Sequence, residues 1–425
     1  MAKGTYGTPL VAPTQHQNLA WSTWIEINLD ALAHNLQQIQ EHSNTLILPI
    51  LKGDAYGHGA PVVAAFLQSL GYEFFGVSSV EEALTILEFT KPTLLLLTPP
   101  SLDQLPLILR HRLIPTITSP DLVEKLGQLA KTKGRHVTVH LKVDTGFGRL
   151  GVAPEEALEL VRLIEKTPYL TLGGIFTHFS MAFKDSTFTR NQLDILLKLR
   201  AQLGKEYSQI LWHGANSAAF LNMPASHLDL VRIGTLLYGQ SPFPVDQTWT
   251  LQDTWLVKTR ILQIRTLPKG HLIGYGGDYK TPRSMEVGVI GAGFAHGLDL
   301  EPQGIPWHQL RLALKRMMKG QQPHVLYKNR ALPVVGRIGM GLSCVDLTLA
   351  PELKVGAELV VPMRRTTANA HLPHIYTYKG KVHCIFWNNR IYFDGQWKTN
   401  SKGLFLAKSP LRHGSGPALH TLAGQ

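Results

Sequence analysis

Short apolar runs rich in β-branched residues alternate with longer amphipathic stretches between Leu46 and Gly234. This alternation is typical of βα units built around a parallel sheet. In the longer stretches apolar residues recur at three- and four-residue spacing, which indicates helices. Eight βα units within about 200–250 residues predict an α/β fold, a closed (β/α)8 TIM barrel. The eight predicted strands are Leu46–Lys52, Glu73–Ser78, Thr93–Thr98, Pro115–Thr118, Val137–Asp144, Leu172–His178, Ile210–Gly214 and Asp229–Gly234.

The pattern differs on either side of this region. A strand-like piece, Trp24–Leu29, and a helix from Asp30 to about Glu41 come before the first βα unit. After Pro242, strand-like runs separated by Gly and Pro turns predict a mainly β C-terminal domain. These runs are Leu256–Arg265, Met285–Ala292, Val325–Asn329, Leu332–Gly336 and Ser343–Thr348.

The predicted organisation therefore has four parts. Residues 1–20 form a flexible extension, 21–245 the barrel, 246–400 the β domain and 401–425 a weakly structured tail. Inside the β domain, Trp307–Lys319 has the pattern of a basic amphipathic helix, which we interpret as a solvated surface helix. The length of 425 residues agrees with two domains, since single cores stop growing near about 250–300 residues.

Composition narrows the class of protein. Hydrophobic residues at 44% and charged residues at 17% exclude a disordered chain. Two cysteines cannot form a secreted disulfide framework and favour a reducing cytoplasm. No apolar run approaches the roughly 20 residues that cross a bilayer, so no membrane segment is expected. The net charge of +12 suits an enzyme with anionic ligands, and no nucleic acid partner is expected because RNP, zinc-knuckle and helix-turn-helix signatures are absent.

Candidate chemistry lies where the predicted strands end, the face of such barrels that carries reacting groups. Lys52 ends an apolar strand, where desolvation would lower its pKa and make the amine a nucleophile. The stretch Gly214–Ser217 and the turn at Gly234 offer backbone N–H groups and a hydroxyl where barrels commonly bind phosphate. With Arg232 ending the last strand, these groups indicate pyridoxal phosphate held by Lys52. The alternative is a capping lysine beside ordinary βα turns, and no metal site is predicted.

The same residues carry a resemblance to a known family. Ile50–Gly59 (ILKGDAYGHG) resembles the pyridoxal-phosphate lysine motif VKANAYGHG of the alanine racemase family. That resemblance implies a barrel followed by a β domain, pyridoxal 5'-phosphate as cofactor, a small amino-acid substrate, and a homodimer whose active sites take groups from both chains. Further stretches agree with the family in order and spacing: His140–Gly151, Gly174–Phe179, His213–Ala219, Asp229–Pro242 and Leu332–Thr348.

The resemblance also implies roles for single residues. Lys52 would hold the cofactor and act as one of two bases, Arg232 would face the pyridine nitrogen, and Arg149 would lie near the substrate carboxylate. Because a guanidinium keeps its proton, that ring nitrogen would stay unprotonated. Lys142 matches a position that is often carbamylated, or is a salt-bridging strand lysine. The remaining cofactor candidates are Tyr56, Asn216, Ser217, Gly234, Tyr376 and His178, which lies under the ring or merely ends a strand.

Three departures from the family fall in the β domain. The family's second base is a tyrosine in a G-Y-A-D-G motif, whereas the stretch here reads G-F-A-H-G and places Phe294 at that position. Phenylalanine has no ionisable hydroxyl. The family's C-M-D-Q loop reads G-M-G-L, so Met340 remains as a substrate contact while Gly341 replaces the acid. The segment after Val361 is shorter than in the family, which affects the assignment of Tyr376.

These observations predict a racemase of the alanine type, supplying D-alanine, that works slowly or with a replacement base such as His296. Two alternatives stay open. One is a lyase or aldolase reaction that uses Lys52 alone, and the other is a non-catalytic protein that binds pyridoxal phosphate.

Overall fold

The computed structural model describes residues 21–246, 248–300, 307, 310–311, 314, 322–393 and 396–398. These residues separate into two compact units. Residues 31–253 form the first, and residues 21–30 together with 254–398 form the second. None of the described helices combines the length and hydropathy that a membrane crossing needs. The predicted extension 1–20 and tail 401–425 lie outside the described residues.

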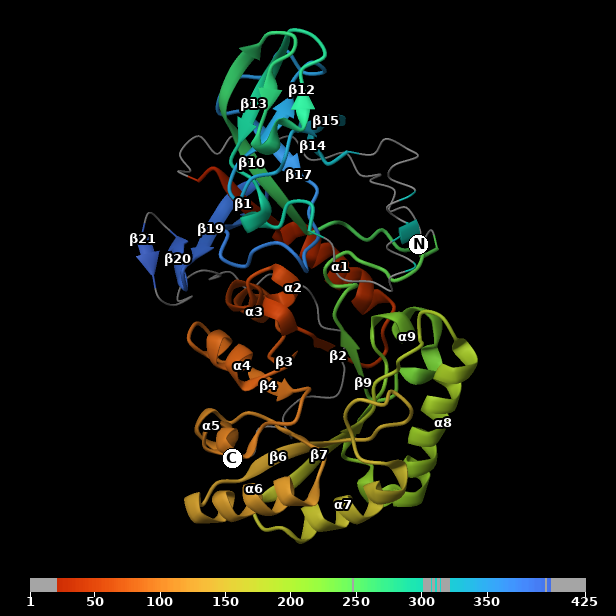
Figure 1. Cartoon of the computed structure of the whole chain (residues 1–425). Helices are drawn as coiled ribbons and strands as arrows, with labels where there is room; N and C mark the ends of the chain where they lie inside the picture. The colour runs from red at the N-terminus through yellow and green to blue at the C-terminus, as the bar shows by residue number, and fades with distance from the viewer. Residues whose placement is uncertain are drawn as a thin grey trace. The chain divides into compact units, whose positions relative to one another are not determined.

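The first unit is a closed barrel of eight parallel strands, as the sequence predicts (Figure 1). Neighbouring strands follow chain order, and the first pairs with the last through Leu48↔Arg232. Single bridges at Ile50↔Gly76 and Leu95↔Ile114 continue the ring where the ladders are short. The strands are β2 (Leu46–Pro49), β3 (Phe74–Val77), β4 (Thr93–Leu96), β5 (Thr116–Ile117), β6 (Val137–Lys142), β7 (Leu170–Phe176), β8 (Leu211–His213) and β9 (Leu230–Ile233).

Helices lie outside these strands, and local sequence sets where they begin and end (Figure 1). Ser79 and Ser119 cap two of them, each accepting a backbone N–H with its side chain, and Gly134 ends one in the left-handed conformation. The helices are α1 (Leu29–Glu41), α2 (Lys52–Gly57), α3 (Ala60–Ser69), α4 (Val80–Leu87), α5 (Leu105–His111), α6 (Pro120–Lys133), α7 (Pro154–Lys166), α8 (Ser186–Leu203) and α9 (Ser217–Asn222), with 3-10 turns at Leu102–Gln104, Lys205–Tyr207 and Pro224–Ser226.

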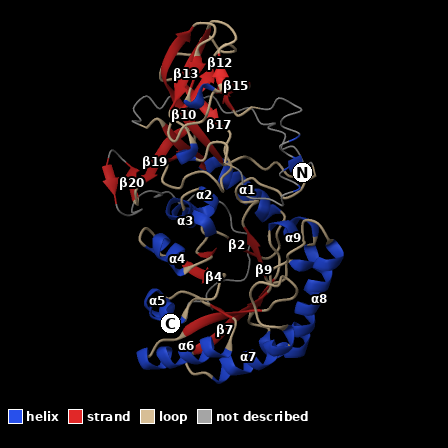
Figure 2. Cartoon of the chain, in the orientation of Figure 1, coloured by secondary structure: helices blue, strands red, loops and turns tan. Residues whose placement is uncertain are grey.

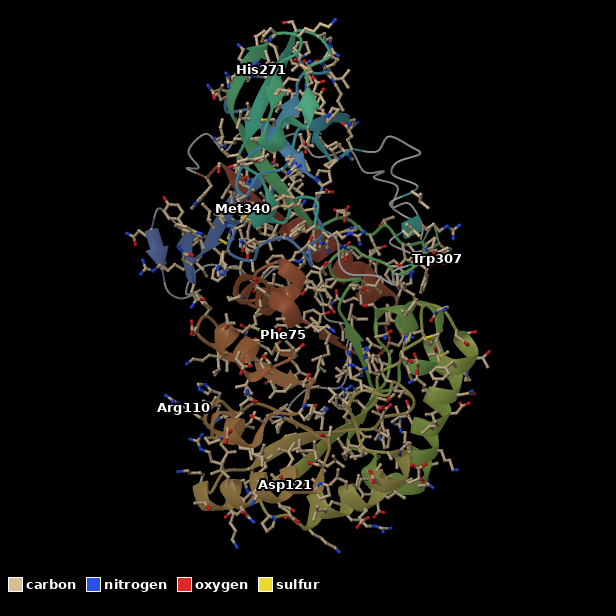
Figure 3. The ribbon with its side chains drawn as sticks, viewed as in Figure 1. Phe75, Arg110, Asp121, His271, Trp307 and Met340 are labelled. Carbon is tan, nitrogen blue, oxygen red and sulfur yellow. The ribbon has the colours of Figure 1, made fainter. Side chains whose placement is uncertain are left out.

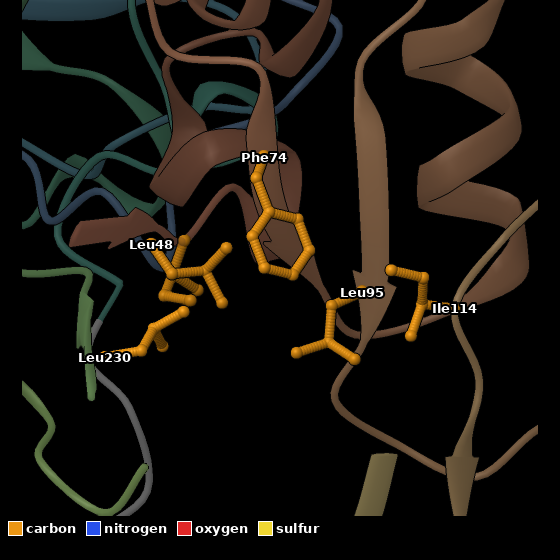
Figure 4. Packing of buried hydrophobic residues seen from close by; sticks show 6 residues of the cluster. Leu48, Phe74, Leu95, Ile114 and Leu230 are labelled. Atoms are coloured by element: carbon orange, nitrogen blue, oxygen red, sulfur yellow. The ribbon is translucent and has the colours of Figure 1, made fainter. Parts of the chain in front are cut away.

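Apolar side chains from successive strands fill part of the barrel. Leu48, Phe74, Leu95, Ile114 and Leu230 form one buried cluster (Figure 4). All come from β2, β3, β4 and β9 or from the segment just before β5, so the cluster ties the first strand to the last. Such a packed interior leaves the strand ends to carry polar chemistry.

The second unit is mainly β (Figure 2). Its long strand β10 pairs with β1 and β17 through its first half and with β13 through its second half, after an irregularity between Ile261 and Gln263. Six strands therefore close in the order β10-β13-β16-β15-β14-β17, and β1 leads on to β18-β19-β20-β21. The strands are β1 (Thr23–Asn28), β10 (Trp255–Leu267), β11 (Leu272–Ile273), β12 (Tyr279–Lys280), β13 (Met285–Ile290), β14 (His324–Tyr327), β15 (Arg330–Val335), β16 (Ser343–Asp346), β17 (Glu358–Val361), β18 (His374–Tyr378), β19 (Lys381–Trp387), β20 (Arg390–Phe393) and β21 (Gln396–Lys398), with 3-10 turns at Tyr275–Gly277 and Phe294–His296.

The structure differs from the prediction at the first strand. We placed residues 21–30 with the barrel, but β1 pairs antiparallel with β10 and parallel with β18, so it belongs to the β unit. The predicted basic helix Trp307–Lys319 lies mostly outside the described residues. Its described members, Trp307, Leu310, Arg311 and Leu314, are helical and exposed.

Candidate active site

Lys52 begins a turn with unusual backbone geometry. It directly follows the first barrel strand, and the next four residues, Gly53 to Tyr56, all have φ between 53° and 61°. Three of the four are not glycine, and the left-handed conformation costs an L-residue about 1–2 kcal/mol. Such strain persists only where surrounding contacts hold the backbone, and it is frequent at functional sites.

Several hydrogen bonds hold this turn. The Asp54 carboxylate accepts the Ala60 N–H at 2.7 Å, which joins the turn to the start of α3. The His58 ring donates from Nδ1 to the Ala55 carbonyl at 2.8 Å. At the other end, the Gly53 N–H donates to Glu82 Oε1 at 2.7 Å. The turn is therefore anchored on both sides of the left-handed residues.

The surroundings of Lys52 favour a neutral amine. Burial lowers the Lys52 pKa from its ordinary 10.5, and the positive charges of Arg149 and Arg232 lower it further, whereas the Glu82 carboxylate raises it. Its Nζ lies 5.9 Å from the centre of the Tyr56 ring. A neutral amine is the form that attacks a carbonyl or accepts a proton.

Tyr56, Ser217 and Gly234 lie together at the ends of the first and last strands. A Cβ built on Gly234 would lie 2.3 Å from the Tyr56 hydroxyl oxygen, so only glycine allows this approach. Ser217 Oγ accepts the Gly234 N–H at 3.1 Å. Burial, aided by the Glu82 charge, raises the Tyr56 pKa to about 12, so its hydroxyl remains a donor. The group places a phenol and a serine hydroxyl within one small region.

Asn216 contributes to the fold of this region. Its Oδ1 caps α9 by accepting the Ala219 N–H at 3.1 Å, and its Nδ2–H donates to the Phe179 carbonyl at 3.0 Å. Both ends of the amide are thus engaged by the barrel itself. Asn216 positions Ser217, the residue that follows it.

Arg232 is buried and gathers several carbonyls around its guanidinium. Nη2–H donates to the carbonyls of Thr177 at 2.7 Å and Gly214 at 3.0 Å, and to His178 Nδ1 at 3.3 Å. Burial lowers the Arg232 pKa to about 9, so it stays charged at neutral pH. The Nε–H is the donor that these bonds and those of Nη1 leave unused. A ligand atom with a lone pair would meet it in the barrel.

Two buried histidines extend from the other side of Arg232. Its Nη1–H donates to His213 Nδ1 at 2.8 Å, and His213 Nε2 lies 3.0 Å from His140 Nδ1. Because arginine only donates, His213 accepts at Nδ1 and carries its proton on Nε2. His213 Nε2–H therefore donates to His140 Nδ1, which leaves the His140 proton on Nε2. Burial and the Arg232 charge lower the His140 pKa to about 3 and hold that of His213 well below its ordinary value. The pair is a neutral relay that orients the guanidinium.

A cleft follows β6 and β7. It is lined by Lys142, Asp144, Phe147, Arg149 and His178, with Thr177, Val143 and Leu150. The exposed Arg149 guanidinium lies 4.1 Å from the centre of the Phe147 ring. Burial alone would raise the Asp144 pKa, but backbone N–H donors from Gly146, Phe147, Gly148 and Arg149 lower it below its ordinary value. Asp144 thus shapes the loop that presents Arg149.

Lys142 sits in the floor of this cleft. Its Nζ–H donates to the Leu97 carbonyl at 3.0 Å, a carbonyl partner where the salt-bridge alternative required a carboxylate. Burial and the charges of Arg232, Arg149 and Lys52 lower the Lys142 pKa to about 8, against an opposing contribution from Asp144. A fraction of the amine is therefore neutral at physiological pH.

The remaining candidates lie in the β unit. Phe294 and Met340 belong to two loops that bind each other, because the N–H groups of Phe294 and Ala295 donate to the carbonyls of Gly339 and Met340 at 3.0 and 2.8 Å. The Phe294 side chain is 42% exposed and that of Met340, labelled in Figure 3, is 72% exposed. A Cβ on Gly341 would have no atom within 4 Å. Tyr376 is a residue of β18, and its predicted contact with phosphate stays a prediction.

His296 belongs to the same turn as Phe294. Its Nδ1 accepts the Gly293 N–H at 3.1 Å, so the neutral ring carries its proton on Nε2. Burial lowers the His296 pKa below its ordinary value. No group of three His, Cys, Asp or Glu side chains that could hold a metal ion occurs in the described part of the chain.

Comparison with known proteins agrees with this geometry along both units. Residues 27–242 match the family described as "Alanine racemase, N-terminal domain", and residues 255–390 match "Alanine racemase, C-terminal domain". The chain belongs to the alanine racemase family. Members of this family use pyridoxal phosphate, and the family assignment and fold inferred from the sequence are confirmed.

Individual relatives cover most of the chain. "Alanine racemase 1" of Caldanaerobacter subterraneus subsp. tengcongensis is 34% identical over 352 residues, which are 80% of this chain and 85% of the relative. The alanine racemase of Chlorobaculum tepidum is 33% identical over 343 residues, 79% and 85% of the two chains. A solved alanine racemase of Clostridium difficile superposes with a TM-score of 0.78 at 26% identity, covering 87% of this chain and 99% of the other. The same racemase has also been solved in complex with cycloserine.

Sequence reasoning did not assign roles to four residues that the structure places in the barrel site. His140 and His213 stand in motifs that resemble those of alanine racemases, but neither motif reveals that the two rings bind each other. Tyr238, whose hydroxyl donates to the Ile50 carbonyl at 3.0 Å, supports the rings of Tyr56 and His58. Glu82 was detectable only as part of a helix-start signature, Ser79-x-x-Glu82.

Proposed function

We propose that this protein is a pyridoxal-phosphate-dependent amino-acid racemase acting on a small substrate such as alanine, and that it is slowed by the loss of its second base. The observation that carries the proposal is the desolvated Lys52 amine at the mouth of the barrel, beside Tyr56, Ser217, Gly234 and Arg232. These groups are those that a phosphorylated pyridine aldehyde would require.

The barrel residues fit the cofactor in three respects. Because Gly234 has no Cβ, the Tyr56 hydroxyl can approach its backbone beside Ser217, which brings together two hydroxyls suited to phosphate. Lys52 offers a nucleophilic amine. Arg232 stays charged and keeps one N–H uncommitted for a pyridine nitrogen. When bound, pyridoxal phosphate supplies an electron-withdrawing ring that acidifies the α-hydrogen of an attached amino acid.

The chain's own groups would then bind and orient the substrate. The Arg149 guanidinium, stacked on Phe147 at the cleft, would bind the substrate carboxylate. The hydrogen bonds from the backbone to the Asp144 carboxylate would hold the loop that carries Arg149 in place. Lys52 Nζ, whose pKa burial lowers, would remove the α-proton from one face of the substrate and return it there.

The opposite face would lack a comparable base. The resemblance puts Phe294 where the family has its tyrosine, and phenylalanine exchanges no proton. His178 and His296 each use Nδ1 as an acceptor, so each neutral ring presents an N–H that can take no proton from carbon. Water is then the proton carrier on that face. Interconversion of the two enantiomers is therefore expected to be slow.

Hydrogen exchange separates this proposal from its rivals. In deuterated buffer with pyridoxal phosphate, we expect the α-hydrogen of one alanine enantiomer to exchange at least about tenfold faster than that enantiomer is converted to the other, because Lys52 alone shuttles the proton. Deuterium incorporation by mass spectrometry and chiral separation measure the two rates on one sample. Equal rates for exchange and conversion would show a working second base, and no exchange with cofactor bound would reject catalysis of this kind.

A second candidate reaction draws on Phe294 and Gly341 together. The resemblance implies that these two positions contact the substrate, and without the hydroxyl and the acid they would leave room for a larger side chain on it. The neutral Lys52 amine could take the hydroxyl proton of a β-hydroxy amino acid as the Cα–Cβ bond breaks and an aldehyde leaves, and then return that proton to the α-carbon. Aldehyde release from a panel of such amino acids tests this reaction directly.

We also propose that Lys142 is carbamylated. The neutral fraction of its amine, set by a pKa of about 8, would add carbon dioxide and lose a proton, giving an anion between the cationic groups of Arg149 and Arg232. We expect carbon-13-labelled bicarbonate to give a carbamate NMR signal that is absent from Lys142→Gln. Lys131→Gln, an exposed lysine of α6, is the control that should keep the signal. A spectrum without this carbamate signal contradicts the modification.

A further inference from the structure

Glu82 joins two neighbouring loops at the mouth of the barrel. It lies in the first turn of α4 and is half-buried. One carboxylate oxygen, Oε1, accepts the Gly53 N–H at 2.7 Å, and the other, Oε2, accepts the Ser78 N–H at 2.7 Å. Gly53 follows the first barrel strand and Ser78 the second. The carboxylate is thus a clamp between consecutive strand ends.

Helix capping explains only one of the two bonds. Ser79 is the N-cap of α4, and its side chain accepts the Glu82 N–H at 3.3 Å. In a capping box the glutamate would return a bond to the N–H of Ser79, and here it accepts the N–H one residue earlier. This bond serves the start of α4. The bond to Gly53, 29 residues away in the chain, does nothing for that helix.

The bond to Gly53 falls where the backbone needs support. Gly53 is the first of the four left-handed residues and directly follows Lys52. Asp54 and His58 hold the far side of the turn, so Glu82 supplies the anchor nearest the lysine. A left-handed run containing three non-glycine residues relaxes unless several contacts oppose it. Losing this anchor would free the backbone that aims both Lys52 and Tyr56.

We propose that Glu82 is a positioning residue of the Lys52 site, whose carboxylate fixes the start of the left-handed turn and balances the positive charges around the lysine. The proposal rests on the proposed function for its catalytic consequence, but not for its test. Glu82 acts through the turn and touches no reacting atom.

The electrostatic half of the proposal depends on every charged group around Lys52. Arg149 from the loop after β6 and Arg232 from β9 lower the Lys52 pKa, and Glu82 from α4 is the acid that raises it. Lys142 on β6 and His178 after β7 also interact with Lys52, since the Lys52 charge lowers the pKa of each. Tyr56 stays neutral beside the amine. Without the Glu82 charge, the groups that shift the Lys52 pKa would be the cations Arg149 and Arg232.

Three variants of the full chain separate the hydrogen bonds from the charge. Glu82→Gln keeps the shape but has one acceptor oxygen and no charge, and Glu82→Asp keeps the charge on a side chain one carbon shorter. Glu81→Gln is the matched control, because Glu81 is the adjacent residue of the same helix and its carboxylate accepts a hydrogen bond from the Gln104 side chain. Amide hydrogen exchange at Gly53 and Ser78 reports the clamp. The pH midpoint for reductive methylation of the Lys52 amine reports its protonation without requiring activity.

In Glu82→Gln we expect about tenfold faster exchange at Gly53 or Ser78, because one N–H loses its charged acceptor. The pH midpoint for reductive methylation of the Lys52 amine should fall by about half a pH unit or more. Glu82→Asp should exchange the Gly53 or Ser78 amide hydrogen faster than the wild type but keep the wild-type pH midpoint for Lys52 methylation. Glu81→Gln should change neither the amide exchange nor the midpoint. Faster exchange with an unchanged midpoint would assign Glu82 a purely structural role and overturn the proposal, as would exchange equal to that of Glu81→Gln. Failure of the wild type to bind pyridoxal phosphate would reject the proposed function and leave these readouts intact.

Discussion

Phe294→Tyr is expected to raise the rate of alanine racemisation by about 10²–10⁴-fold, the range that a positioned acid or base typically contributes. The new phenol would give the second face of the substrate a group that can donate and accept a proton. Racemisation followed by chiral chromatography, with pyridoxal phosphate saturating in both proteins, measures the gain. In deuterated buffer the α-hydrogen of alanine should then exchange at a rate closer to the rate at which one enantiomer is converted to the other.

The structure makes this substitution a clean one. The turn that carries Phe294 is held by bonds from Phe294 and Ala295 to the Gly339–Met340 backbone and by the Asn369 side chain on the Ala295 carbonyl. None of these bonds involves the ring, which is partly exposed and has room for a hydroxyl. The substitution should therefore leave the backbone of the turn unaltered, so a change in the racemisation rate would report the added hydroxyl.

Phe393→Tyr is the control for this experiment, because it adds the same hydroxyl to β20 of the β unit. It should leave the rate unchanged. If Phe294→Tyr gains nothing, the second base is not what limits the protein, and the Gly341 position becomes the next to restore. Addition of Gly341→Asp to Phe294→Tyr would then test whether both loops must return to the family pattern.

The barrel could be predicted from sequence because its signal is local. Strands buried on both faces read as continuous apolar runs, and several helices between them have Ser or Pro where they begin, while α6 and α8 end at Gly. The (β/α)8 architecture follows from these signals, whereas the family assignment follows from the motifs that resemble those of alanine racemases. The pairing of β1 is not local: its residues predict a strand just before the barrel, and only the distant partners β10 and β18 place it in the β unit.

The site was less accessible to prediction than the fold. Lys52, Arg232 and Ser217 could be predicted as candidate site residues because strand ends collect reacting groups in barrels. The left-handed turn could not, since Asp54, Ala55 and Tyr56 are poor residues for that conformation and adopt it only because Asp54, His58 and Glu82 hold it. The direction of the His140–His213–Arg232 relay likewise follows from three buried side chains that lie far apart in the sequence.

Lys52→Ala is expected to abolish both α-hydrogen exchange and alanine conversion, with a loss of more than about 10⁴-fold, because two functions vanish with one amine. The lysine is proposed to anchor the cofactor covalently and to move the substrate proton. Visible absorbance of the cofactor-loaded protein reports the first function, and deuterium incorporation into alanine reports the second. Lys52→Arg retains a cation at the site but is neither a nucleophile nor a base at neutral pH, so it should lose both signals as well.

Added methylamine separates the two roles of the lysine. A small amine that enters the emptied position in Lys52→Ala can replace the base but cannot tether the cofactor to the chain. We therefore expect methylamine to restore part of the hydrogen exchange, in proportion to its neutral fraction, without restoring a covalent link detectable after borohydride reduction. Lys131→Ala, on an exposed helix of the barrel, should keep every property of the wild type. Exchange that persists in Lys52→Ala without added amine would place the working base elsewhere, and the desolvated lysine at the end of the first strand would then serve the fold alone.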